Sequence, residues 1–350
     1  MKAMIVNGCD FKVDRARRRP EMAPDSLLVR PVAVALNPTD WKSVSYNRAA
    51  DGCIVGCDYA GVVEAVGKEV SKPWRPGDKV FGCGHGANLV NANDGVFAEY
   101  AAVKGDLQMR IPDGWTFEKA TTAPLGLITV GQGLYQKALK LNLPTSPERN
   151  GDVPVLIYGG TTATATLAIQ LAKLSGYTVV TTCLPESFKH VKSLGADFAL
   201  DYTDPDVGAK IRHLTQNELR YAWDTISIPA SAQICADALS TNSSLGIRYG
   251  NLLPVKSPRE DVETTTTVMY TVFGKHFKFG DRDMPASRED FEFGKTFYAM
   301  AEQLMLQGKV RTHPEKVGEN GLDGAVKGFE LMKAGKVAGQ KLVFRVGDTL

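Results

Sequence analysis

Net charge, long apolar runs and clustered metal ligands are all scarce in this 350-residue sequence. The net charge is only +2, which leaves no basic stripe of the kind that nucleic-acid-binding proteins use. No apolar run approaches the roughly 20 residues of a membrane-spanning helix. The N-terminal MKAMIVNG reads as a strand and not as a signal peptide. We therefore expect a soluble, cytoplasmic protein that binds neither nucleic acid nor membrane.

Paired cysteines and metal-ligand clusters are missing as well. The six cysteines are scattered, most of them in apolar, strand-like contexts, which predicts free thiols in a reducing compartment. No histidine lies at ligand spacing from Cys53, Cys57 and Cys83, and the five histidines form no local cluster. The sequence therefore predicts buried apolar thiols and no metal site.

Turn residues and apolar patterns divide the chain into a β-rich first third and an alternating remainder. We expect strands at Leu27–Leu36, Gly61–Val66, Lys79–Gly82 and Phe97–Ala102, then a helical stretch from Phe117 to Leu141. From Val153 onward strands and helices alternate, which predicts a parallel, doubly wound sheet. The expected helices there are Ala163–Ser175, Ser187–Leu194, Asp206–Thr215 and Ser231–Leu239, between strands at Thr178–Cys183, Phe198–Asp201, Tyr221–Thr225 and Leu245–Tyr249. A final strand, Lys341–Val346, is expected to return to the β-rich part.

The segment Val155–Thr166, VLIYGGTTATAT, is the most informative. An apolar strand, a Gly-Gly turn and a helix of small residues form the order of a phosphate-binding βα turn. Gly159 permits the sharp turn, and small side chains let the backbone approach a pyrophosphate. Thr162 and Ala165 stand where the usual pattern has glycines. On this stretch alone, an ordinary capped helix is the alternative.

Four blocks precede this turn in order: Asn37–Asp40, Gly56–Gly67, Pro76–Gly82 and Gly95–Tyr100. With the turn they resemble the medium-chain dehydrogenase/reductase superfamily along essentially the whole chain. The resemblance implies an α/β protein with a GroES-like, β-rich catalytic and substrate domain at 1–125 and 300–350. A doubly wound Rossmann domain that binds NADPH is implied at 126–299.

Zinc members of that superfamily carry Cys and His ligands in the catalytic cleft. Here Trp41 follows Asp40, and Cys57 stands where the catalytic histidine would be. Without such a Lewis acid, alcohol oxidation is disfavoured, and zinc-free relatives mostly reduce polarised carbon–carbon double bonds or quinones. The Thr/Ala run Tyr158–Thr166 resembles the fungal trans-acting enoyl reductases of highly reducing polyketide synthases, the group of the lovastatin enoyl reductase. Supporting blocks are Leu174–Tyr177, Leu219–Asp224 and Gly339–Val343.

This closer resemblance implies NADPH-dependent conjugate reduction of the α,β-unsaturated acyl thioester of a growing polyketide. The substrate would be tethered to a carrier protein of a partner highly reducing synthase, or of a hybrid with a peptide synthetase. It also implies a monomer, whereas the superfamily resemblance implies a dimer formed through the cofactor domain. A stand-alone NADPH quinone or alkenal reductase is one alternative, and a cofactor-binding scaffold protein without turnover is another. The cationic segments Arg15–Arg19 and Lys72–Arg75 are either solvated loops or docking contacts for an acidic partner.

The second strand of the cofactor domain ends without an acid at its tip, which favours NADPH over NAD. The resemblance assigns the 2′-phosphate region to Leu184, Pro185, Glu186, Ser187 and Tyr202. It assigns further cofactor contacts to Thr39, Asp40, Trp41, Lys42, Gly159, Thr161, Thr162, Ala163, Thr164, Asn251, Leu252, Val337 and Ala338.

Conjugate reduction needs hydrogen-bond donors at the developing enolate oxygen and a source for the proton at Cα. Lys42 and Thr129 are the candidate catalytic residues. The alternative for Lys42 is a solvent-exposed lysine without a role in the site, and the alternative for Thr129 is a residue that only packs its helix. Tyr46 and water are candidate proton sources. The resemblance places the substrate along Thr129, Val130, Gly131, Gln132, Gly133, Leu134, Tyr135 and Gln136, and along Tyr270, Thr271, Val272, Phe273 and Gly274. An apolar core strand is the alternative for the second run.

Overall fold

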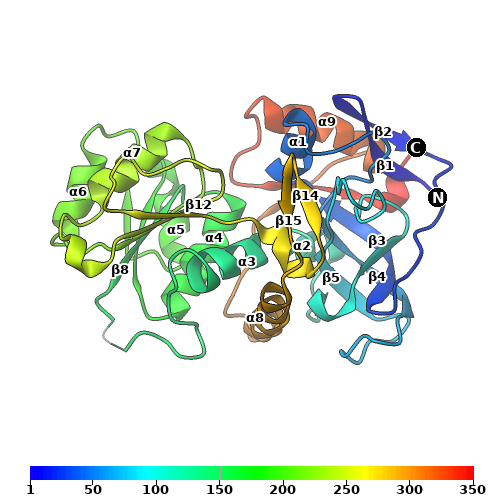
Figure 1. Ribbon diagram of the computed structural model, residues 1–350, viewed down its shortest axis with the longest axis horizontal. Helices are drawn as coiled ribbons and strands as arrows, with labels where there is room; N and C mark the ends of the chain where they lie inside the picture. The colour runs from blue at the N-terminus through cyan, green and yellow to red at the C-terminus, as the bar shows by residue number, and fades with distance from the viewer. Residues whose placement is uncertain (150) are drawn as a thin grey trace. The chain divides into compact units, whose positions relative to one another are not determined.

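The computed structural model of the protein describes residues 1–149 and 151–350. The chain forms two compact units: unit 1 comprises Met1–Leu125 and Tyr270–Leu350, and unit 2 comprises Gly126–Met269 (Figure 1). Residues 270–299, which the sequence analysis assigned to the cofactor domain, thus fold with unit 1. Within this stretch, the Tyr270 hydroxyl lies 2.7 Å from the Thr39 hydroxyl, and the Tyr298 hydroxyl of helix α8 (Arg288–Leu306) donates to the Pro124 carbonyl at 2.9 Å. The functional assignment of the two domains stays a prediction.

Unit 1 is built on a seven-stranded sheet with the order β16-β17-β3-β4-β5-β7, in which β6 also pairs with β3. All its pairs are antiparallel except β16 with β17. Figure 1 shows β3, β4 and β5 side by side. The pairing of β17 with β3 confirms that the last strand returns to the β-rich part. The strands are β3 (Ser26–Ala35), β4 (Asp58–Val66), β5 (Lys79–Cys83), β6 (Ala101–Lys104), β7 (Met109–Arg110), β16 (Glu315–Val317) and β17 (Lys341–Arg345).

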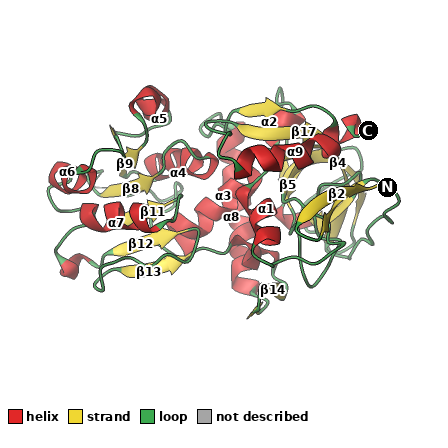
Figure 2. Ribbon diagram, turned by 90° about the horizontal axis from the view of Figure 1, so that it is seen from above, coloured by secondary structure: helices red, strands yellow, loops and turns green. Residues whose placement is uncertain are grey.

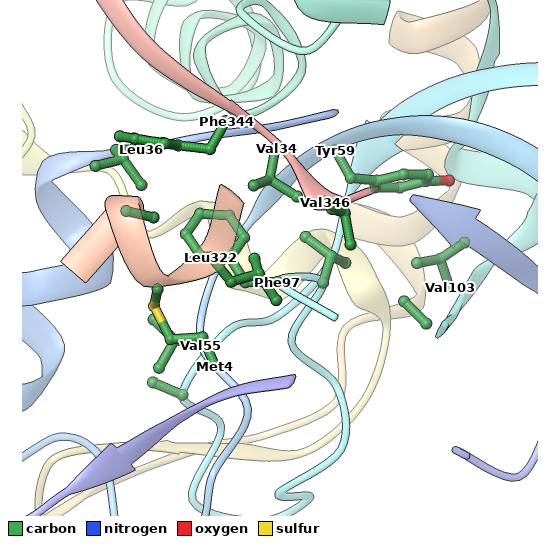
Figure 3. Packing of buried hydrophobic residues seen from close by; sticks show 14 of the residues in the cluster. Met4, Val34, Leu36, Val55, Tyr59, Phe97, Val103, Leu322, Phe344 and Val346 are labelled. Carbon is green, nitrogen blue, oxygen red and sulfur yellow. The ribbon is translucent and has the colours of Figure 1, made fainter. Parts of the chain in front are cut away.

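Two hairpins and four α-helices complete unit 1. The hairpins are β1 (Ala3–Asn7) with β2 (Asp10–Asp14), and β14 (Phe277–Phe279) with β15 (Arg282–Met284). The helices are α1 (Pro38–Ser45), α2 (Phe117–Ala120), α8 and α9 (Gly321–Lys333). Side chains from β1, β3, β4, β17 and α9 form one buried cluster that includes Met4, Val34, Tyr59, Leu322 and Phe344 (Figure 3). Burying such side chains stabilises a fold by about 1.5–3 kcal/mol each, which fixes the strands from which α1 projects.

Unit 2 contains a six-stranded parallel sheet with the order β10-β9-β8-β11-β12-β13. This is the doubly wound order in which dinucleotides bind where the strand order reverses, here between β8 and β11. Figure 2 shows β8, β11, β12 and β13 side by side. The strands are β8 (Pro154–Tyr158), β9 (Thr178–Thr182), β10 (Phe198–Leu200), β11 (Tyr221–Asp224), β12 (Arg248–Asn251) and β13 (Glu263–Thr266).

Both faces of this sheet are covered. Successive residues of a strand point to opposite sides, so burial of neighbouring residues shows that both sides are packed. Leu156 and Tyr158 of β8 belong to a buried cluster with residues of α6 and α7, while Val155 and Ile157, on the other face, are also fully buried. The helices of unit 2 are α4 (Ala163–Leu174), α5 (Phe188–Ser193), α6 (Val207–Leu214) and α7 (Pro229–Ala238), and α3 (Pro124–Val130) leads into it. The predicted doubly wound sheet is therefore confirmed.

Two predicted elements differ from the structure. The helical stretch Phe117–Leu141 is broken into α2, α3 and a π-helical turn at Gly131–Gln136. Proline lacks an amide donor and restricts the residue before it, so Pro124 begins a new helix. The run Met269–Phe273 is a 3₁₀-helix and not a strand. Conversely, β13 and the β14–β15 hairpin were not predicted.

Candidate functional site

The phosphate-binding turn of unit 2 lies directly after β8. Gly159 adopts a φ of +81°, a left-handed conformation that glycine tolerates, and a Cβ there would lie 2.8 Å from Oγ1 of Thr225. The turn is tied to the end of β9, because the amides of Gly159 and Gly160 donate to the Thr182 hydroxyl and carbonyl at 3.1 and 2.8 Å. α4 then begins with amides that have no partner within the helix. This arrangement suits a pyrophosphate.

Thr162 explains why this turn does without its second glycine. Its hydroxyl accepts a hydrogen bond from the Ala165 amide at 3.0 Å and so caps α4. The same hydroxyl lies 2.9 Å from the hydroxyl of Thr225, which in turn donates to the Tyr158 carbonyl. Thr162 therefore fixes the helix start against the end of β11. The sequence analysis missed Thr225, and no local motif marks it.

The other predicted cofactor residues of unit 2 follow the carboxyl ends of parallel strands, so they lie along one edge of the sheet. Leu184–Ser187 follow β9, and Tyr202 follows β10; the Cys183 amide donates to the Leu200 carbonyl at 3.0 Å and keeps the two loops adjacent. Leu184 and Tyr202 are exposed. Asn251 is the last residue of β12, and Leu252 follows the strand. No acid stands at the β9 tip, although the exposed Glu186 lies in the next turn.

A buried carboxylate organises the centre of this edge. Oδ2 of Asp224, at the end of β11, accepts hydrogen bonds from the Ser231 hydroxyl at 2.5 Å and the Tyr249 hydroxyl at 2.7 Å. Oδ1 accepts from the amides of Ile226 and Ser227. The next loop is thereby shaped, and its Ser227 hydroxyl accepts the Leu252 amide at 2.9 Å. Asp224 was part of a motif in the sequence, but its role was not predicted.

The predicted substrate run Thr129–Gln136 of unit 2 is mostly packed inside the unit. Thr129 and Gln136 are half-buried, and the residues between them are buried. Gly133 is needed here, since a Cβ would lie 2.6 Å from the Trp223 ring. Thr129 is thus the half-buried hydroxyl of this run, and its contact with substrate stays a prediction.

Helix α1 carries the predicted site residues of the N-terminal part of unit 1. It begins after Asn37, whose amide donates to Oδ2 of Asp40 at 2.8 Å. Asp40 is 2% exposed, and among the residues that the structure describes its Oδ1 has no hydrogen-bond partner. Burial raises the pKa of Asp40 to about 7, and the charge of Asp58 adds to the rise. The Asn37 amide, the neighbouring Cys57 thiol and Lys341 act against the rise.

Lys42 lies on α1 beside an aromatic ring. Its ammonium is 5.7 Å from the centroid of the Trp41 ring, and both residues are half-buried. Burial lowers the pKa of Lys42, and the positive charge of Arg48 lowers it further. Arg48 lies over the rings of Tyr46 and Phe279. Lys42 is therefore a cation that is partly withdrawn from water, as a donor to a developing negative charge should be.

The structure brings Tyr270 together with two residues of the N-terminal part of unit 1. Its hydroxyl lies 2.7 Å from the Thr39 hydroxyl and 3.6 Å from the Cys57 thiol. Its ring stacks on His85 with centroids 4.1 Å apart, and Phe277 meets the same imidazole edge-on. Burial lowers the pKa of His85 to about 3, so this imidazole is neutral at physiological pH. The sequence analysis predicted Tyr270 and Thr39 separately, but not their contact.

The remaining predicted residues of unit 1 are more dispersed. Thr271, Val272 and Phe273 are buried, and Gly274 ends their 3₁₀-helix. Val337 and Ala338 lie in the loop between α9 and β17, where Val337 packs on the main core of unit 1. Within the described residues, no three or more His, Cys, Asp or Glu side chains are grouped to hold a metal ion. All six cysteines are free thiols, and five of them are buried.

Among the described residues, no helix combines the length and apolarity needed to cross a bilayer.

Comparison with known proteins agrees with this geometry. Residues 23–113 match the alcohol dehydrogenase GroES-like domain family, and residues 163–251 match the zinc-binding dehydrogenase family. The chain is 43% identical to trans-enoyl reductase resD of Aspergillus sclerotiorum, over 94% of this chain and 95% of that protein. It is 52% identical to trans-enoyl reductase TOXD of Cochliobolus carbonum, over 74% of this chain and 85% of that protein. A mycobacterial protein solved with NADPH has the same fold, with a TM-score of 0.71, 22% identity, and coverage of 99% of this chain and 100% of that one.

The residues at the sheet edge of unit 2 fit a nicotinamide dinucleotide. The Gly159 turn has no room for a Cβ. The first turn of α4 offers the amides that precede Ala165, whose own amide donates to Thr162. Oδ1 of Asn251 is buried at the end of β12 and has no partner among the described residues. A buried acceptor of this kind is costly unless a donor reaches it. The edge thus combines an anion-binding turn with a buried acceptor, Oδ1 of Asn251, that a hydrogen-bond donor of the cofactor could satisfy.

Proposed function

The chain belongs to the trans-enoyl reductases, enzymes of the medium-chain dehydrogenase/reductase superfamily, and we propose that it reduces the α,β-double bond of an acyl thioester held by a partner polyketide synthase. The observation that carries this proposal is the 43% identity to one trans-enoyl reductase over nearly the full length of both chains. The reaction is part of secondary-metabolite assembly, with the growing polyketide tethered to a carrier protein.

The proposed cofactor is NADPH, held by Gly159, Thr161–Thr164, Leu184–Ser187, Tyr202 and Asn251–Leu252 of unit 2. The neutral tip of β9 supports this choice, because no carboxylate stands at the tip itself to bind the ribose hydroxyls of NAD or repel a 2′-phosphate; the nearest acid, Glu186, lies in the next turn. When bound, the cofactor supplies the hydride. In unit 1, Thr39–Lys42, Val337 and Ala338 are the proposed further contacts.

The chain's own residues must stabilise the charge that develops when Cβ gains a hydride. The thioester carbonyl oxygen then becomes an enolate oxygen, which needs preorganised donors. Lys42 is proposed to supply one, since partial burial strengthens its attraction for an anion. The half-buried hydroxyl of Thr129 is proposed to supply another. The runs Thr129–Gln136 and Tyr270–Gly274 are proposed to flank the acyl chain.

The proposed partner is a highly reducing polyketide synthase, alone or as a hybrid with a peptide synthetase, and the enzyme is proposed to act as a monomer. Three of the cations considered for docking already have contacts. Arg15 pairs with Asp323 at 3.1 Å, and the Arg19 guanidinium lies 3.8 Å from the centroid of the Tyr100 ring. Lys72 donates to the Gln108 carbonyl, whereas Arg75 is exposed. Arg75 is therefore the better-placed docking cation of these four.

The test follows NADPH oxidation on two substrates side by side, a medium-length enoyl thioester on a pantetheine arm and a simple quinone. Turnover of the thioester with little turnover of the quinone supports the proposal. The reverse pattern indicates a quinone reductase, and NADPH binding without turnover of thioester, quinone or a synthase-bound acyl chain indicates a scaffold role. Lys42→Ala and Thr129→Val should each lower kcat on the thioester by at least tenfold. Thr129→Val should retain NADPH affinity within a few-fold, whereas Lys42→Ala also removes a proposed cofactor contact and should weaken NADPH binding.

A further inference from the structure

We propose that the hydroxyl of Tyr270 donates the proton that completes the reduction at Cα. Thr39, Cys57 and Asp40 form the polar path that returns a proton to it. This proposal rests on the proposed function and adds to it the residue that ends the reaction. It also replaces Tyr46, the earlier candidate, whose side chain is 50% exposed and lies under Arg48.

The position of the Tyr270 hydroxyl carries the inference. It lies within hydrogen-bonding distance of Thr39, a half-buried residue in the first turn of α1, the helix that also carries Lys42. On its other side the hydroxyl contacts the buried Cys57 thiol at 3.6 Å. A buried phenol that touches two exchangeable groups from other elements is a built polar site and not a chance packing contact. The stacked His85 ring fixes the direction in which the phenol points.

The chemistry of a phenol suits this step. Burial, together with the nearby Cys57, raises the pKa of Tyr270 well above its ordinary value, so the hydroxyl stays protonated at physiological pH. After hydride addition, Cα of the enolate takes the proton of the hydroxyl, the C=O bond re-forms, and the electron pair of the O–H bond remains on the tyrosine oxygen. The resulting phenolate then takes a proton through Thr39 or Cys57, ultimately from water. No oxidant or reductant beyond the hydride donor is needed.

Asp40 is the group that can replenish this proton. Its Oδ1 has no hydrogen-bond partner among the described residues, and its carboxyl lies beside Cys57. The groups that face it are the Asn37 amide, Cys57, Asp58 and Lys341. Burial raises its pKa to about 7, so near neutral pH it exists in both protonation states. Such a carboxyl both releases and regains a proton readily.

The central experiment compares Tyr270→Phe with Tyr298→Phe. Tyr298 is also a fully buried tyrosine of unit 1 beside a buried cysteine, with its hydroxyl 3.1 Å from Cys83 and 2.9 Å from the Pro124 carbonyl. Both variants lose one buried hydroxyl, but only Tyr270 lies on the proposed path. Each is assayed with an unbranched enoyl pantetheine thioester in D₂O, and kcat, the NADPH dissociation constant and the configuration of deuterium at Cα are measured.

For Tyr270→Phe we expect kcat to fall at least 100-fold, the usual effect of removing a general acid. The NADPH dissociation constant should change less than twofold, and deuterium should appear at Cα in both configurations, because solvent then reaches both faces of the enolate. Tyr298→Phe should keep kcat within threefold and a single configuration. A Tyr270→Phe enzyme with kcat near wild type and a single configuration overturns the proposal.

A second measurement needs only the wild-type enzyme and Asp40→Asn, should Tyr270→Phe fail to fold. If the acid form of Asp40 supplies the returning proton faster than water does, as proposed, wild-type kcat should fall as the pH rises through about 7. In Asp40→Asn this inflection should disappear and kcat should be low throughout. A wild-type kcat that is flat from pH 6 to 9 refutes the role of Asp40. A wild-type enzyme that does not turn over any enoyl thioester refutes the proposed function itself, which separates the two failures.

Discussion

Nζ of Lys341 lies 2.5 Å from Oδ2 of Asp58, and the two side chains are only 5% and 0% exposed. The same carboxylate accepts hydrogen bonds from the Asn37 side chain at 3.0 Å and the Leu125 amide at 2.7 Å. One buried ion pair thus joins β4, the last strand β17, the residue before α1 and the start of α3. Because Asn37 precedes the helix that carries Lys42, this pair also positions the proposed site.

Replacing Asp58 should be far more costly than replacing an exposed partner. Asp58→Asn leaves the ammonium of Lys341 buried without a counter-charge, and breaking a buried pair in this way costs about 3–5 kcal/mol. The matched control is Glu330→Gln, which removes the partner of Lys333 at 2.8 Å on the exposed face of α9 and should cost less than about 1 kcal/mol. Urea unfolding of both variants measures the difference, and equal losses contradict the prediction.

The buried carboxyl of Asp40 should make stability depend on pH. Its pKa is raised from 3.8 to about 7 in the folded protein. The unfolded chain therefore releases this proton first, and the free energy of unfolding falls as the pH rises from about 4 to 7. Asp40→Asn lacks this pH dependence. The free energy of unfolding of Asp40→Asn minus that of wild type should therefore be larger at pH 8 than at pH 5, by roughly 2–3 kcal/mol. Urea unfolding at both pH values tests this, with Asp281→Asn as an exposed control. An equal difference at the two pH values contradicts it.

The doubly wound sheet was predictable from the sequence because its signals are local. Each of the strands β8, β9, β10 and β11 is a short run followed by a helix, and the Gly159 turn lies within one βα unit. The neutral tip of β9 is also visible in the sequence. Boundaries shifted by up to a few residues, as at β12, where the structure places Arg248–Asn251 and not Leu245–Tyr249.

The contacts that give the site its chemistry were not predictable, because they join distant parts of the chain. Tyr270 and Cys57 are 213 residues apart, and Lys341 and Asp58 are 283 apart. No periodicity links such positions, and each residue alone has an ordinary explanation as core packing. The raised pKa of Asp40 likewise depends on burial, which a four-residue motif does not reveal.

Gly159→Ala should weaken cofactor binding beyond its effect on stability. A non-glycine residue at a φ of +81° costs of the order of 1–3 kcal/mol, and the new Cβ would press on Thr225, displacing the turn. We expect the NADPH dissociation constant to rise at least tenfold. Gly246→Ala is the matched control, since its φ is +68° but a Cβ meets nothing within 4 Å. It should lose similar stability in urea yet bind NADPH as wild type does. Equal NADPH affinities in the two variants contradict the assignment.

A single charge at Leu184 should weaken the preference for NADPH over NADH. Leu184 is the exposed residue that precedes the turn after β9. If the 2′-phosphate of NADPH lies there, Leu184→Asp places a carboxylate beside it. Repulsion of like charges at a half-solvated site is worth about 1–2 kcal/mol, so the KM for NADPH should rise on the order of tenfold. The KM for NADH, which lacks that phosphate, should change little. Leu184→Asn has nearly the same shape without the charge and should leave both values near wild type. If Leu184→Asp and Leu184→Asn raise the KM for NADPH equally, shape and not charge governs this position, and the phosphate binds elsewhere.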